Sequence, residues 1–240
     1  KFVIYIIIIS YNIMKVFYWS PFISYVATTN AVINSIKSIN KFSKGRLDCK
    51  IINVFKEWDE YAKSLKDLNI ELLDLKTTLD IKKLPKGNFL KSRFTYFLTF
   101  FFSLFKLNKL LREEKPEFFI IHLITFIPLI LLIFFNYKTK FILRISGYPK
   151  LHIFRKIMWK LVANKIEKVF CPTSLTKELL IKKKIFDPEK IFLVRDPIID
   201  VKNITNKKKQ KIKDDDKILN NKKYILSIGR LTKQKNFSFL

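Results

Sequence analysis

Short apolar runs that alternate with helical stretches constrain the fold of this 240-residue chain more than any other feature. Several runs are continuously apolar, which is typical of parallel strands buried on both faces. The strands that we expect are Lys15–Tyr18, Cys49–Val54, Ile70–Leu75, Phe118–Leu123, Lys140–Ile145, Ile166–Cys171 and Lys190–Val194. The helices that we expect are Tyr25–Ile39, Arg93–Arg112, Phe126–Phe135, Leu151–Ala163 and Leu175–Lys184, the last with Thr173 or Ser174 as N-cap. This order predicts an α/β fold, a parallel sheet with helices on both faces and ligands at the carboxyl ends of its strands.

Glycine is scarce, and its positions exclude two nucleotide-binding motifs. The four glycines are Gly45, Gly87, Gly147 and Gly229. Neither G-x-G-x-x-G nor G-x-x-x-x-G-K-[ST] can be written from these positions. The sequence therefore lacks the dinucleotide-binding fingerprint and the P-loop.

The formal net charge is +27, which favours an anionic partner such as a negatively charged membrane surface, phosphorylated substrates or nucleic acid. A bias towards A/T-rich codons is the alternative explanation for much of the lysine excess. Nucleic-acid binding lacks a recognition motif, and we expect no nucleic-acid partner. The two cysteines and two histidines are isolated along the chain, so we expect neither a metal site nor a disulfide framework, and a reducing cytoplasm fits.

Three segments need a separate interpretation. Residues 1–13 form an apolar N-terminal extension of uncertain nature, either an upstream translation artefact or a short extra segment, with a signal peptide or anchor as the alternative. Phe118–Phe135 has almost no polar residues, and we favour a strand plus a buried helix over the alternative of a membrane span. Residues 201–223 carry nine lysines and few apolar residues, which predicts a charged linker between domains.

The stretch Tyr224–Phe237 reads as a buried strand, a turn at Gly229 and a group of cations. Arg230, Lys233 and Lys235 lie within six residues of one another. A strand that ends in a glycine turn beside fixed cations is suited to holding a phosphate. An ordinary solvated basic loop is the alternative.

Five segments together resemble glycosyltransferase family 4, whose members have the two-domain GT-B fold. The segments are Tyr18-Trp-Ser-Pro-Phe-Ile-Ser24, Arg144-Ile-Ser-Gly-Tyr-Pro-Lys150, Phe170-Cys-Pro-Thr-Ser174, Asp196-Pro-Ile-Ile-Asp200 and Ser227-Ile-Gly-Arg-Leu-Thr-Lys-Gln-Lys-Asn236. The last is the most specific, and the others contribute mainly by order and spacing. The resemblance covers Met14–Leu240.

The resemblance implies two Rossmann-like domains that face each other across a cleft. Residues 14–200 would be the acceptor-binding domain, and 224–240 the start of a nucleotide-sugar-binding domain that is otherwise missing. The enzyme would be a retaining, metal-independent transferase of the hexosyl type, with no cofactor beyond the nucleotide-sugar co-substrate. Gly229, Arg230 and Lys235 match the family's grip on the donor diphosphate, where fixed cations stabilise the leaving group.

Three further residues are weaker candidates. His122 would lie at the cleft as a catalytic or acceptor-orienting residue, with a buried structural histidine as the alternative. Ser20 and Arg144 would line the acceptor cleft, although Arg144 is equally suited to a structural ion pair. Three departures from the family are a first loop without glycine, the absence of the acidic E-x₇-E pattern, and a second domain of which about 150 residues would still be required after Leu240. We therefore expect a fragment that is inactive by itself.

The leading hypothesis is a sugar transferase that acts on a saccharide or lipid-linked acceptor in cell-surface polysaccharide or lipopolysaccharide synthesis. It would be cytoplasmic and peripheral to the inner face of an anionic membrane. The alternative is a basic membrane-surface protein without catalysis, because the Phe-rich and basic helical stretches favour an interfacial position.

Overall fold

A computed structural model describes residues 13–22, 27–77, 80, 89–210, 227–229 and 236–239. At positions 89–96, 98–100, 203 and 238 it describes the backbone without the side chain. The pattern of internal contacts divides the chain into two compact units, Lys1–Ile198 and Ile199–Leu240.

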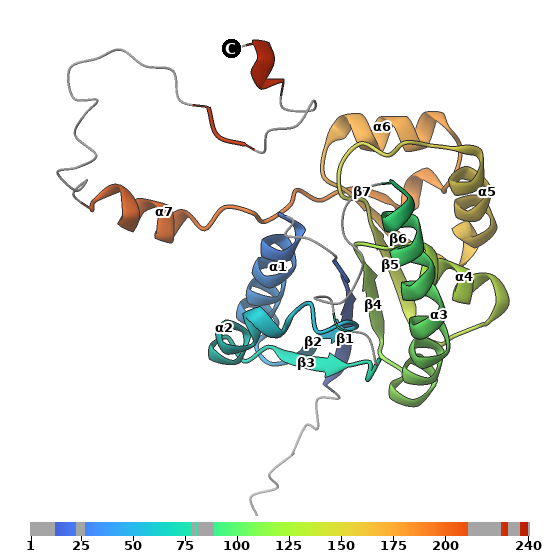
Figure 1. The fold of residues 1–240 in the computed structure, drawn as a ribbon, viewed down its shortest axis with the longest axis horizontal. Helices are drawn as coiled ribbons and strands as arrows, with labels where there is room; N and C mark the ends of the chain where they lie inside the picture. The colour runs from blue at the N-terminus through green and yellow to red at the C-terminus, as the bar shows by residue number, and fades with distance from the viewer. Residues whose placement is uncertain are drawn as a thin grey trace, which may run out of the picture. The chain divides into compact units, whose positions relative to one another are not determined.

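Seven parallel strands form one sheet in the first unit (Figure 1). The strands are β1 (Met14–Trp19), β2 (Leu47–Asn53), β3 (Glu71–Asp74), β4 (Phe118–Ile121), β5 (Lys140–Arg144), β6 (Ile166–Cys171) and β7 (Ile191–Leu193). Their order in the sheet is β3-β2-β1-β4-β5-β6-β7, and every neighbouring pair is parallel. The predicted parallel sheet is confirmed.

Helices cover both faces of this sheet. One face carries α1 (Thr28–Ser43) and α2 (Ala62–Asp67), and the other carries α3 (Phe89–Glu114), α4 (Phe126–Phe134), α5 (Ile153–Val162) and α6 (Ser174–Lys182). Thr173 is the N-cap of α6, because its side chain accepts a hydrogen bond from the Thr176 amide. The α/β fold with helices on both faces is thus the one that the sequence predicts.

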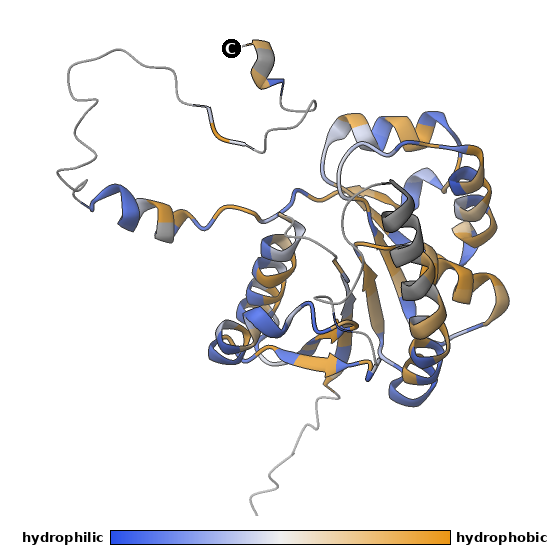
Figure 2. Ribbon diagram, viewed as in Figure 1, coloured by the Kyte–Doolittle hydropathy of each residue, from blue (hydrophilic) through white to orange (hydrophobic). Residues whose placement is uncertain are grey.

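Burial on both faces explains why the strands read as continuous apolar runs. Along β1, Phe17 and Trp19 pack into the larger core cluster with α3–α6, whereas Val16 and Tyr18 pack into the cluster under α1 and α2. Successive side chains of a strand point to opposite faces, so a strand covered on both sides needs apolar residues at every position. Figure 2 shows β4 and α4 mainly in orange, the colour of hydrophobic residues.

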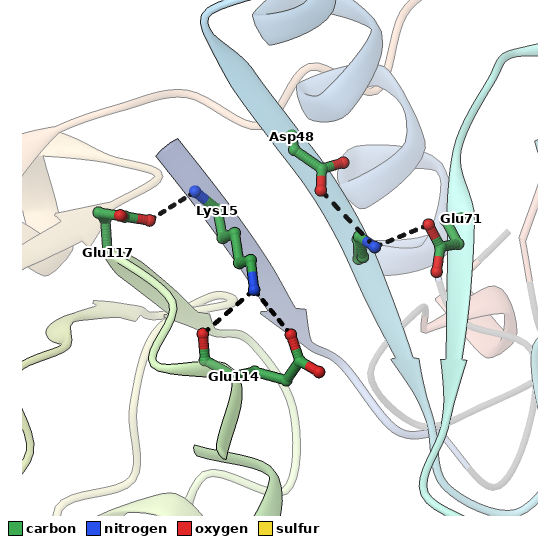
Figure 3. A network of polar contacts seen from close by, with 6 residues as sticks. Lys15, Asp48, Glu71, Glu114 and Glu117 are labelled. Atoms are coloured by element: carbon green, nitrogen blue, oxygen red, sulfur yellow. Dashed lines mark hydrogen bonds and ion pairs between the residues drawn. The ribbon is translucent and has the colours of Figure 1, made fainter. Parts of the chain in front are cut away.

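Polar contacts gather at the amino ends of the strands (Figure 3). The Lys15 ammonium lies 2.9 Å from a Glu114 carboxylate oxygen, and the Lys15 amide donates to Glu117 at 2.5 Å. On the neighbouring strand Lys50 pairs with Glu71 at 2.8 Å. These contacts fix β1 to the α3–β4 connection and β2 to β3.

Several expectations are refined by the structure. Phe118–Phe135 is a strand followed by a nine-residue helix, as we favoured over a membrane span. None of the described helices has the length and apolar character that crossing a bilayer requires. The charged linker begins with a helix, α7 (Val201–Lys208), which the sequence analysis did not anticipate because the segment lacks an apolar face that a core would bury. Of the predicted extension 1–13, only Ile13 lies within the described residues.

Candidate functional site

A pocket of about 1090 Å³ opens at the carboxyl ends of β4 and β5. Its wall is made by the segment after β4, the turn after β5 and the first two turns of α5. It lies beside the β1–β4 pair, where the strand order reverses direction. Ligands of open parallel sheets bind in the crevice at such a switch point.

Unusual backbone conformations shape the rim of this pocket. Gly147, in the turn after β5, has a φ of 99°, a conformation that residues with a Cβ rarely adopt. Ile124, after β4, has a φ of 45°, which is uncommon for a β-branched residue. The Ile124 carbonyl accepts a hydrogen bond from the Trp19 indole at 3.2 Å, so the loop after β4 is fastened to the end of β1.

His122 follows β4 directly and lines the pocket. Its amide donates to the Trp19 carbonyl at 2.9 Å, and its ring lies 5.8 Å from that of Tyr18. The side chain is buried, and its Nδ1 has no hydrogen-bond partner. Burial, with a smaller contribution from the Arg144 charge, lowers the pKa of His122 to about 3. The imidazole is therefore neutral at physiological pH.

Arg144 lines the same pocket and also forms a buried ion pair. Its Nε donates to Asp196 Oδ1 at 2.9 Å, and one terminal nitrogen donates to the Val194 carbonyl at 2.7 Å. The structural ion-pair role that the sequence left open is thus present. Its predicted role in acceptor binding remains a prediction.

Ser20 lies one residue beyond the carboxyl end of β1 and is fully buried. Its hydroxyl has no hydrogen-bond partner. The backbone bond from His122 to Trp19 places Ser20 next to His122 along the β1–β4 ladder, although Ser20 is not part of the pocket wall. The structure thus places Ser20 near His122 but behind the wall of the pocket.

The predicted donor-diphosphate residues lie in the second unit. Gly229 is described and exposed, whereas Arg230 and Lys235 lie outside the described residues. Ile228 is 83% exposed and stands outside any strand, so the predicted buried strand is not seen at its described end. The diphosphate-binding role of these residues stays a prediction.

Sequence reasoning missed the α5 side of the pocket. Lys150, Arg155 and Trp159 all line it, and the buried Trp159 indole nitrogen has no hydrogen-bond partner. The only local signal was the start of a basic amphipathic helix without a Ser, Thr, Asp or Asn cap. Within the described residues there is no group of three or more His, Cys, Asp or Glu that would hold a metal ion.

Comparisons with known proteins bear on the fold. No protein-family model matches the chain, and no curated protein matches it. A structure from Listeria monocytogenes assigned to the UDP-N-acetylglucosamine 2-epimerases is similar, with a TM-score of 0.53 at 15% identity over 75% of this chain. The UDP-GlcNAc 2-epimerase of Neisseria meningitidis, bound to UDP-GlcNAc, has a TM-score of 0.50 at 15% identity over 81%. A glycosyltransferase from Rickettsia africae has a TM-score of 0.50 at 12% identity over 77%.

The fold is the Rossmann-like fold of GT-B proteins. The chain spans less than half the length of these three relatives, namely 44%, 49% and 43%. At such identities the likeness shows the fold alone.

Proposed function

We propose that the sheet unit is the acceptor-binding domain of a GT-B glycosyltransferase of family 4. The complete protein would transfer a hexosyl group from a nucleotide sugar to a saccharide or lipid-linked acceptor, in the synthesis of cell-surface polysaccharide or lipopolysaccharide. The observation that carries the proposal is the large pocket beside the β1–β4 switch point, with a neutral buried histidine in its wall. Sites of this size and position hold small-molecule substrates.

The chemistry of the pocket suits a hydroxyl acceptor. A neutral imidazole both donates and accepts hydrogen bonds, so His122 would orient a sugar hydroxyl without adding a charge. The Arg144 guanidinium is offset by Asp196, which limits its role to a positioned donor rather than a free cation. We assign His122 the role of contacting the transferred sugar or the acceptor, and Arg144 a supporting role in the wall.

In the two-domain arrangement that we propose, the donor would be held by a nucleotide-sugar-binding domain. Arg230 and Lys235 would stabilise the charge that develops on the departing diphosphate, and Gly229 would let the backbone approach it. With this charge held by side chains, the proposed reaction proceeds without a metal ion. Retention of the anomeric configuration is proposed separately, from the family resemblance. Neither feature follows from the fold alone, so both are part of the proposal.

A transfer assay tests this function. The polypeptide encoded by the complete reading frame is incubated with labelled nucleotide sugars and membrane extract, with and without a chelator. We expect transfer that survives chelation, and a loss of at least about a hundredfold in the double variant Arg230→Gln and Lys235→Gln. Conversion of the nucleotide sugar to its C2 epimer without an acceptor, in place of transfer, would refute the proposal.

Exposed apolar rows on two helices favour contact with a membrane surface. On α3, Phe97, Phe101 and Phe105 recur every four residues and are 61%, 60% and 72% exposed. Helix α5 also has exposed apolar side chains with basic ones beside them in the sequence. They are Ile153, Phe154, Ile157 and Leu161 with Lys156 and Lys160. Apolar rings with flanking lysines bind anionic bilayers, so we propose that the protein is peripheral to the cytoplasmic face of the membrane.

Vesicle flotation tests the membrane contact. We expect the chain to float with phosphatidylglycerol-containing vesicles, and the double variant Phe101→Ser and Phe105→Ser to bind about tenfold more weakly. Phe42→Ser on α1, on the other face of the sheet, is the matched control because Phe42 is also exposed. Vesicle binding without any transfer by the complete protein would favour the alternative of a non-catalytic membrane-surface protein.

A further inference from the structure

The first turn of α5 presents unpaired backbone amides at the rim of the pocket. His152 is the N-cap, yet its side chain makes no capping hydrogen bond, and the first turn contains no acidic residue. The first helical hydrogen bond runs from the Lys156 amide to the His152 carbonyl at 3.0 Å. The amides of Ile153, Phe154 and Arg155 precede it, so they have no partner within the helix and carry the positive end of its dipole.

A second, independent feature of the same pocket is an unpaired buried donor. Trp159, one helical turn further along α5, is 3% exposed and lines the pocket. Its indole nitrogen has no hydrogen-bond partner. An indole nitrogen can only donate, and a buried donor without an acceptor is costly. A bound acceptor atom would remove this cost.

The charges around this end of the pocket have one sign. Lys150 and Arg155 both line it, and Arg155 is held in place because its Nη1 donates to the Lys150 carbonyl at 2.9 Å. The Arg155 guanidinium also lies 5.9 Å from the ring centroid of Trp159. Among the described residues that line the pocket, none is Asp or Glu. An anion would therefore meet backbone donors and cations there, with no carboxylate to repel it.

We propose that the start of α5, with Lys150, Arg155 and the Trp159 indole, binds a phosphoryl group of the acceptor substrate. Three backbone amides, a guanidinium fork and an ammonium offer more donors than a carboxylate can satisfy, whereas a phosphate has three terminal oxygens to accept them. The remaining pocket has room for the sugar that carries the phosphate. The assignment to the acceptor rests on the proposed function, but the anion site itself does not.

Nuclear magnetic resonance of the ¹⁵N-labelled 240-residue chain tests the anion site. Inorganic phosphate is titrated at constant ionic strength, with chloride as the reference. We expect saturable shifts of the Ile153 and Arg155 amides and of the Trp159 indole resonance. Trp58 is the internal control, since its buried indole nitrogen is also unpaired but it does not line the pocket. Shifts at Trp159 that chloride reproduces, or that move Trp58 equally, would overturn the proposal.

Two substitutions on α5 separate the site from the stability of the fold. His152→Asp supplies a capping carboxylate that competes for the same amides, so phosphate should bind at least about tenfold more weakly while the melting temperature stays the same or rises. Lys160→Gln removes a charge from the far end of the same helix and should leave the affinity within about twofold. Equal phosphate affinity of the His152→Asp variant and the wild type would overturn the proposal.

The source of the phosphoryl group is assigned by competition. If a soluble sugar phosphate binds at the same resonances with higher affinity than inorganic phosphate, the acceptor is soluble. Tighter binding of vesicles that carry a polyprenyl phosphate indicates a lipid-linked one, and both results support the site. If UDP bound at these resonances more tightly than either, the assignment to the acceptor would be wrong. A failure of sugar transfer with intact phosphate binding would refute the proposed function alone.

Discussion

Arg144, at the end of β5, donates through Nε to Asp196 Oδ1 at 2.9 Å and so joins β5 to the segment after β7. The two residues are 52 positions apart in the sequence. The Arg144 side chain is only 5% exposed, so Asp196, and not water, compensates most of its charge. The pair therefore holds one wall of the pocket in place.

Removing Asp196 should destabilise the sheet unit strongly. Asp196→Asn leaves a buried guanidinium without its counter-charge, and we expect the free energy of unfolding in urea to fall by about 3 kcal/mol. Glu113→Gln is the control, because the Lys109–Glu113 pair is exposed and should contribute less than about 1 kcal/mol. Equal losses in both variants would contradict the structural role of the Arg144 pair.

A buried carboxyl group in the loop after β2 should make stability depend on pH. Glu57 accepts hydrogen bonds from the Val54 and Phe55 amides, yet burial raises its pKa to about 7. The folded protein then binds a proton more tightly than the unfolded chain, so stability from this group is present at low pH and lost as pH rises from about 4.5 to 7. We expect stability measured by urea unfolding to fall by about 2 kcal/mol between pH 5 and pH 7.5 because of this group.

Glu57→Gln should flatten that dependence, because glutamine does not titrate. The difference between wild type and variant cancels the contributions of all other groups. A wild-type protein and a Glu57→Gln variant with the same pH slope would show that the Glu57 carboxyl titrates at its ordinary pKa.

His122 should make the stability of the fold depend on pH in the direction opposite to that of Glu57. Because its pKa falls to about 3 in the folded protein, the unfolded chain takes up the proton first as the solution is acidified. Stability is full above about pH 6.5 and falls as pH drops towards 3, with a loss of about 2 kcal/mol between pH 6.5 and pH 5. His122→Gln should remove this loss in thermal or urea unfolding. An unchanged slope would mean that the imidazole is accessible to protons in the folded state.

The central strands β4 and β5 were predictable because they are buried on both faces and so are written as mostly apolar runs. Phe118–Leu123 shows this directly, since the observed strand starts at the same residue. Ile166–Cys171 also starts where predicted, although Glu167 and Lys168 interrupt its apolar run. Helix α7 was missed, because an exposed polar helix has no apolar face to mark it. The local hydrophobic pattern of the sequence thus predicts the strands and helices that pack into the core, but not an exposed polar helix.

The site was predictable only in part. His122 and Arg144 stood out because they end strands, and parallel strands bring their carboxyl ends to one edge. Trp159 and Arg155 belong to a stretch whose sequence predicts only an amphipathic helix. The tertiary structure is needed to show that this helix lines the pocket. The Arg144–Asp196 pair is likewise invisible locally, because nothing near either residue indicates its partner.

Filling the pocket in the complete protein tests most directly whether this pocket binds the acceptor. Ser146 is exposed and lines it, so Ser146→Trp would place a large ring in the proposed acceptor site, with Ser38→Trp on the surface of α1 as control. We expect Ser146→Trp to raise the KM for the acceptor or to reduce transfer by at least about tenfold, with donor binding unchanged, and Ser38→Trp to have no effect. Wild-type transfer by Ser146→Trp would contradict the claim that this pocket binds the acceptor.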